Sequence, residues 1–68
     1  MSFVIVFDIP RVEATEKVRI NRELHRAEAR KIQDSFWKHT NLKFLIDLAL
    51  RIRKIGGKAG ILEEKFIF

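Results

Sequence analysis

At 68 residues, 47% of them apolar and none a cysteine, the chain predicts one globular domain over residues 1–68 and excludes disulfides and thiolate metal sites. No apolar run reaches the roughly 18 residues of a membrane span, and the N-terminus lacks the basic region of a signal peptide, so we expect a cytoplasmic protein. The net charge of +5 favours an anionic partner, most commonly nucleic acid, although basic proteins without such a partner also exist.

The first predicted element is a strand over residues 3–7. Its residues are all apolar and mostly β-branched or aromatic, which is typical of a strand buried on both faces. It brings Asp8 to the edge of a sheet, and Pro10 marks the exit from that sheet. Thr15 is the predicted N-cap of a helix over residues 16–29, whose narrow apolar stripe covers the sheet.

The middle of the chain predicts a second strand and a second helix. Residues 31–38 alternate in part between apolar and polar side chains, with a hairpin or a bend near residues 39–41. Thr40 or Asn41 could cap the helix predicted over residues 42–55, where apolar residues recur at helical spacing. Its apolar arc is wider than one sheet face needs, so one flank either completes the core or meets a second subunit.

The end of the chain predicts a glycine stop and a last strand. Gly56 and Gly57 end the second helix, residues 58–60 form a loop, and residues 61–68 form the final strand. Its apolar end is either paired inside the sheet or added to the sheet of a neighbour. The order β-α-β-(β)-α-β predicts an α+β fold, a ferredoxin-like split βαβ sandwich with an antiparallel sheet and two helices on one face.

Asp8 is the residue most suggestive of chemistry. Ligands in α/β sheets gather at the carboxyl ends of strands, and a carboxylate there could bind magnesium. One carboxylate makes a poor metal site, but a symmetric dimer would supply a second Asp8. Alternatively Asp8 only caps the turn before Pro10, and its position alone favours that interpretation. His25 and His39 form no recognisable ligand pair, and no HExxH, P-loop or nucleophile-elbow motif is present.

Basic side chains cluster along the first predicted helix and its exit. Such a cluster can follow a phosphate backbone without reading sequence, although acidic residues on the same helix also allow an ordinary solvated face. The candidate nucleic-acid-binding residues are Lys17, Arg19, Arg22, Arg26, Arg30 and Lys31. The Lys/Arg-Gly-Phe type segment of an RNA-recognition motif is absent, which argues against base stacking of that kind.

Two segments together resemble the small CRISPR-associated adaptation protein family (Cas-two). The first is the apolar strand that ends in Phe7-Asp8-Ile9, and the second is the segment Lys31-Ile32-Gln33-Asp34-Ser35-Phe36-Trp37, which has the form basic-Ile-Gln-x-Ser-x-aromatic. The resemblance covers roughly the first half of the chain. The glycine-rich loop usual before the second strand is missing, and residues 42–68 have no distinctive match.

The resemblance implies a ferredoxin-like homodimer that binds duplex nucleic acid in spacer acquisition, with an adaptation integrase as partner. Members of the family have also been described as metal-dependent endonucleases acting on RNA or double-stranded DNA. By resemblance, Asp8 is the catalytic, magnesium-binding carboxylate, and Phe7, Ser35 and Trp37 support it. Two other functions are possible for such a chain, a small interaction or regulatory module without nuclease activity and a toxin-like ribonuclease, because fold alone does not separate them.

Overall fold

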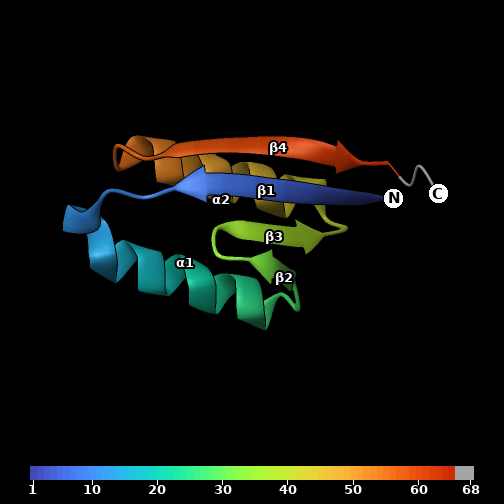
Figure 1. The fold of residues 1–68 in the computed structure, drawn as a ribbon, viewed down its shortest axis with the longest axis horizontal. Coiled ribbons are helices and arrows are strands. Elements are labelled where there is room, and N and C mark those ends of the chain that lie inside the picture. The colour runs from blue at the N-terminus through green and yellow to red at the C-terminus, as the bar shows by residue number, and fades with distance from the viewer. Residues whose placement is uncertain (66–68) are drawn as a thin grey trace.

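The four strands of the protein form one antiparallel sheet in the order β2-β3-β1-β4, with both helices on the same face (Figure 1). In the computed structural model, which describes residues 1–65, the elements in chain order are β1 (Ser2–Asp8), the 3-10 turn η1 (Arg11–Glu13), α1 (Ala14–Arg26), β2 (Arg30–Gln33), β3 (Phe36–His39), α2 (Leu42–Lys54) and β4 (Lys58–Glu64). The α+β, ferredoxin-like split βαβ fold expected from the sequence is therefore confirmed. Within these residues, neither helix is long and apolar enough to cross a membrane.

Strand β1 lies inside the sheet, and its side chains point alternately to the two faces. Ile5 and Phe7 are buried beneath the helices, and Trp37, the β3 neighbour of Ile5, is buried with them. Val4 and Val6 point to the opposite face, which neither helix of residues 1–65 covers. The remaining core residues come from the inner sides of the two helices, namely Ile20, Leu24, Leu45, Leu48, Ala49 and Ile52.

Helix α1 begins and ends earlier than its sequence pattern predicted. The predicted cap Thr15 lies inside the first turn, and Glu13 occupies the N-cap position without a side-chain hydrogen bond. The preceding η1 turn explains the shift, because it already places the chain in a helical path before Ala14. The helix ends at Arg26 because Glu28 adopts a left-handed φ of 60°, which turns the chain towards β2.

The single strand predicted over residues 31–38 is a hairpin of two short strands, β2 and β3. Asp34 and Ser35 form the turn, and Ser35 has a φ of 64°, a left-handed conformation that serine seldom adopts. The hairpin allows β3 to pair with β1 while β2 lies at the sheet edge. The bend predicted near residues 39–41 is present at Thr40, and Asn41 is the N-cap of α2 as predicted, since its side chain accepts a hydrogen bond of 3.1 Å from the Phe44 N–H.

The C-terminal strand begins earlier than predicted. Residues 58–60, expected to form a loop, belong to β4 and pair with β1, because tertiary pairing outweighs the weak strand propensity of glycine. Gly56, with a φ of 90°, ends α2 as expected. Only residues 61–64 of the predicted last strand are seen as a strand, Lys65 follows it, and residues 66–68 lie outside the described part.

Candidate functional site

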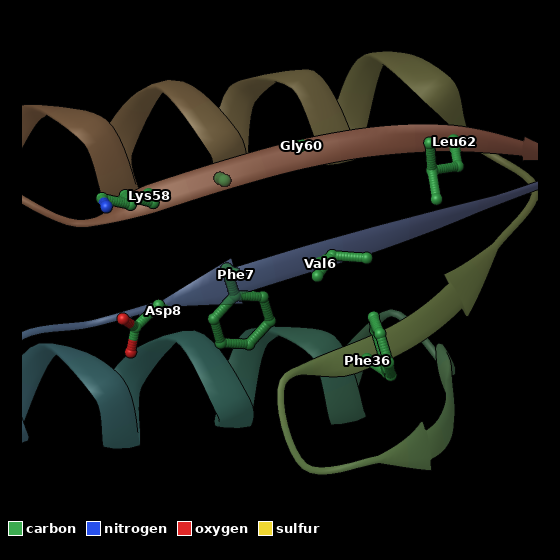
Figure 2. Close-up of a pocket in the computed structure, with 8 residues that line it drawn as sticks. Val6, Phe7, Asp8, Phe36, Lys58, Gly60 and Leu62 are labelled. Carbon is green, nitrogen blue, oxygen red and sulfur yellow. The ribbon is translucent and has the colours of Figure 1, made fainter.

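The sheet face opposite the helices, called the open face below, carries a shallow apolar groove (Figure 2). It has a volume of about 500 Å³. Val6, Phe36 and Leu62 provide apolar side chains from β1, β3 and β4, and Leu62 is 61% exposed. Asp8 and Lys58 lie at one end of this groove (Figure 2). The groove therefore has apolar side chains exposed to water and a pair of charged residues at one end.

Asp8 sits where the sequence predicted, at the carboxyl end of β1, and it is exposed. Its neighbour across the sheet is Lys58, the first residue of β4. The backbone of Asp8 is held against the end of α2, since a Cβ added to Gly57 would lie 2.6 Å from the Asp8 carbonyl oxygen. The position of the carboxylate thus depends on a central strand and on a close helix contact.

Residues 1–65 of one copy do not form a complete metal site. Among residues 1–65, no group of three or more His, Cys, Asp or Glu side chains is placed to hold a metal ion. The oxygen donor of Asp8 is of the kind that magnesium prefers, but magnesium also needs further oxygen ligands. Lys58 opposite Asp8 adds a positive charge, which disfavours a cation unless a second carboxylate is brought close.

The three supporting residues inferred from the family resemblance differ in their relation to the groove, because Phe7 borders it from the core side whereas Ser35 and Trp37 are not among its lining residues. Phe7 is 5% exposed and Trp37 1% exposed, and both pack in the core beneath the helices. Ser35 contacts the strand end through its backbone, because its carbonyl oxygen accepts a hydrogen bond of 3.1 Å from the Phe7 N–H. The structure thus connects Ser35 to the Asp8 region, while Phe7 and Trp37 contribute packing behind the sheet.

The six candidate nucleic-acid-binding residues fall into two groups. Arg19, Arg22 and Arg26 line one depression on α1 together with Glu23, as the spacing of three and four residues between the arginines predicts. Arg30 and Lys31 line a second depression on β2, at the edge of the sheet, together with Ile32, Lys38 and Glu64. Lys17 is separate from the arginine row and lies close enough to Asp34 to act on its charge.

Acidic neighbours offset part of this basic surface. Arg19 pairs with Glu16 at 2.9 Å, and Arg51 of α2 pairs with Glu23 at 2.7 Å. Both glutamates lie on α1, so the second pair also joins the two helices. Within residues 1–65, Arg22 and Arg26 make no ion pair closer than 4 Å, which leaves their guanidinium groups available to an anion.

The β2–β3 turn holds a titratable carboxylate between two lysines. Lys31 Nζ lies 3.1 Å from Asp34 Oδ1. The hydrogen bond and the positive charge of Lys31, with a smaller effect from the charge of Lys17, hold the pKa of Asp34 below its ordinary value. The ion pair thereby links the turn to β2, the strand that precedes it.

The sequence interpretation missed the apolar groove and Lys58 as part of the site. A signal for the groove existed, because Val4, Val6 and Asp8 share one parity of β1 and so must share one face. No signal placed Lys58 opposite Asp8, since residues 58–60 were expected to form a loop. Register between distant strands comes from the whole fold and is invisible in a local pattern.

Comparison with known proteins returns no relative that could name this site. Neither protein-family models, nor curated proteins, nor solved structures yield a match to the chain. The resemblance to the CRISPR-associated family accordingly rests on two short motifs, one ending at Ile9 and one at Trp37. Any function for the chain has to be argued from the charges, the surfaces and these motifs.

Proposed function

We propose that this chain is a cytoplasmic, Cas-two-like homodimer that binds duplex nucleic acid in spacer acquisition, beside an adaptation integrase. The observation that carries the proposal is the row of Arg19, Arg22 and Arg26 on the outer side of α1. Guanidinium groups at this spacing can contact successive phosphates, and such contacts supply affinity without sequence information. The motif resemblance supplies the biological setting.

The homodimer is supported by the open face. Val6 and Phe36 lie on it half-buried, beside the exposed Leu62, so apolar surface stays in contact with water in a single copy. Burying apolar surface is worth about 25 cal/mol per Å², so a second copy seated face to face would be stabilised by this groove. A two-fold axis through the open face would also bring a second Asp8 towards the first.

Magnesium-dependent cleavage is the further part of the proposal. The two Asp8 carboxylates of such a dimer would hold magnesium, whose chemistry there is to activate water and offset charge on a phosphate. Each copy would also bring its own Lys58, which lies across from Asp8, so the proposed pair of carboxylates has two positive charges nearby. Asp8 then has the role of metal ligand, and the arginine row has the role of positioning the nucleic acid.

Salt-dependent binding tests the proposal. We expect duplex DNA or RNA to bind at low salt, and the double variant Arg22→Gln/Arg26→Gln to weaken binding and to lower the slope of log K against log salt by about 2, since each phosphate contact contributes about 0.9. Lys43→Gln/Lys54→Gln, which removes the same charge from exposed positions on α2, serves as the matched control. Equal losses in both double variants, or no binding of the unmodified chain at low salt, would overturn the proposal.

The alternative function is a small interaction module without a nucleic-acid role. The ion pairs of Glu16 with Arg19 and of Glu23 with Arg51 favour it, because they neutralise part of the α1 surface. Binding that is absent at low salt, combined with a stable fold, is the result that this alternative predicts.

A further inference from the structure

Strand β4 forms an edge of the sheet and presents a row of backbone groups to one side. Within residues 1–65 it pairs only with β1. The Phe7 N–H is used by Ser35 on the β3 side, so Phe7 and its partner Ala59 form a non-hydrogen-bonded pair and the Ala59 backbone points outwards. Alternation then turns the backbone groups of Ile61 and Glu63 outwards as well.

An arginine of the same copy already donates a hydrogen bond to a backbone carbonyl group at this edge. Arg53 Nη2 donates a hydrogen bond of 2.8 Å to the carbonyl oxygen of Ala59. This contact agrees with the outward orientation of Ala59 that the β1 pairing requires. The edge is therefore accessible from α2 and carries free hydrogen-bonding groups beyond Ala59.

The sequence of β4 is complementary to itself in one antiparallel register. If Ile61 lies on a two-fold axis, Lys58 falls opposite Glu64 of the partner subunit, and Gly60 falls opposite Leu62 of the partner subunit. The charged pair occurs twice, once on each side of the axis, with opposite signs facing. In a single copy Glu64 Oε1 lies 2.7 Å from Lys38 Nζ, so in this register Glu64 would lie between Lys38 and Lys58 of the partner subunit. In the same register Ala59, Ile61 and Glu63 are the residues that exchange hydrogen bonds, which matches the outward backbone groups of the edge.

Apolar side chains beside the edge extend the same surface. On α2, Ile46 is 41% exposed and Leu50 59% exposed, although the helix is otherwise packed on the sheet. They line a groove of about 180 Å³ together with Arg53 and Ile61. A two-fold axis at Ile61 would place this groove opposite the same groove of the partner subunit. The exposed side of α2 in each copy would then be buried against α2 of the other copy.

We propose that two copies of this chain join through their β4 edges, in the antiparallel register centred on Ile61, to form one continuous sheet. Charge complementarity and the orientation of the free backbone groups select a second copy as the occupant of the edge. Arg53 releases the Ala59 carbonyl on association, and Glu63 of the partner subunit, which falls opposite Ala59, offers its carboxylate to the guanidinium. This contact goes beyond the proposed function, because it uses the sheet edge and leaves the open face free.

Sedimentation of four variants separates the edge contact from the open-face dimer. Glu63→Pro removes an outward N–H and blocks pairing at the edge, whereas Glu63→Ala keeps the N–H and is the matched control. Val6→Lys puts a charge in the middle of the open face. We expect Val6→Lys to leave an edge dimer, Glu63→Pro to leave an open-face dimer, and the double variant Val6→Lys/Glu63→Pro to be a monomer at high micromolar concentration.

The outcomes of this experiment bear on the two contacts separately. A monomeric Val6→Lys variant, or a Glu63→Pro variant that sediments like the unmodified chain, overturns the edge contact. A Val6→Lys variant that sediments like the unmodified chain instead counts against the open-face dimer of the proposed function. Circular dichroism of each variant confirms that the fold is retained before its size is interpreted.

Disulfide trapping tests the register itself. The chain has no cysteine, and Gly60 and Leu62 of the partner subunit would face each other as a non-hydrogen-bonded pair, with Cα atoms about 4.5 Å apart. A Cβ at Gly60 meets nothing within 4 Å. In the Val6→Lys background, Gly60→Cys/Leu62→Cys should give a covalent dimer under mild oxidation, and neither single cysteine variant should. No covalent dimer, or equal trapping by a single variant, overturns the register.

Discussion

At the scale of single residues, Gly57 positions Asp8. The Gly57 N–H donates a hydrogen bond of 2.8 Å to the Ile52 carbonyl oxygen, which closes the end of α2. A Cβ at this position would lie 2.6 Å from the Asp8 carbonyl oxygen and 2.7 Å from Ile52 Cγ2. Any side chain there must displace either the strand end that carries Asp8 or the last turn of α2.

Substitution of Gly57 should therefore be costly. We expect Gly57→Ala to destabilise the protein by about 1–3 kcal/mol, because overpacking against backbone is not relieved by rotamer changes. Urea unfolding measures the loss. Gly60→Ala is the matched control, since a Cβ at Gly60 has open space, and it should change stability by less than about 0.5 kcal/mol. Equal stability of the two variants would contradict the role given to Gly57.

At the scale of elements, the turn of the β2–β3 hairpin contacts the end of β1. Its turn places Ser35 with a φ of 64°, and the Ser35 carbonyl oxygen then receives the Phe7 N–H. The hairpin is short, and Lys31 and Asp34 tie its first strand to its turn at 3.1 Å. The Lys31–Asp34 ion pair thus lies in the same hairpin whose turn contacts the end of β1.

The pKa of Asp34 reports on the hairpin. The lowered pKa means that the pair favours the folded state above the ordinary carboxyl pKa and loses this effect as the pH falls through the lowered value. We expect Lys31→Gln to raise the pKa of Asp34 towards its ordinary value, as measured by NMR titration of its side-chain carboxyl carbon. Lys38→Gln, which leaves the Lys31 contact in place, should not move it. An unchanged pKa in Lys31→Gln would show that the pair is absent in solution.

Some elements could be predicted from the sequence because their information is local. The apolar run of β1, the periodicity of α2 and the stop at Gly56 all depend on nearby residues, and each is found where the pattern placed it. The hairpin was missed because its turn, Asp34-Ser35, contains no glycine and interrupts a pattern that is typical of one strand. The cap at Thr15 was wrong because the η1 turn starts the helical path earlier.

The candidate site was predictable only in part for the same physical reason. Asp8 follows directly from the end of an apolar run, so its place at a strand end is confirmed. The places of the other residues depend on register: Lys58 is brought opposite Asp8 by β1–β4 pairing, and Trp37 is placed opposite Ile5, in the core, by β1–β3 pairing. A resemblance to a family can suggest such residues, but it does not show on which face of the sheet each one lies.

At the scale of the whole molecule, a single copy leaves large apolar side chains exposed to water. Leu62 on the open face and Leu50 on α2 are 61% and 59% exposed, and they lie on different sides of β4. A domain of this size buries a limited share of its surface, so association is a natural source of further stability. Both proposed contacts use this surface, and each one leaves the arginine row of α1 accessible.

The proposed two-copy carboxylate site makes a prediction about cleavage. We expect magnesium-dependent cleavage of nucleic acid by the unmodified chain and its loss in Asp8→Asn, because the amide has no charge to hold the cation. The control is Asp47→Asn, an exposed carboxylate on α2 far along the chain from the strand end. Nucleic-acid binding should persist in both variants. Cleavage that survives in Asp8→Asn would assign the activity to another group or to a contaminant.

The proposed two-copy site, with one carboxylate per copy at the end of β1, would have a consequence for control in the cell. A centre that needs two copies fills in proportion to the square of the free chain concentration as long as single copies predominate. A modest change in expression would then produce a larger change in the number of working centres. Gene dosage, rather than a small-molecule effector, would be enough to turn such a protein on and off.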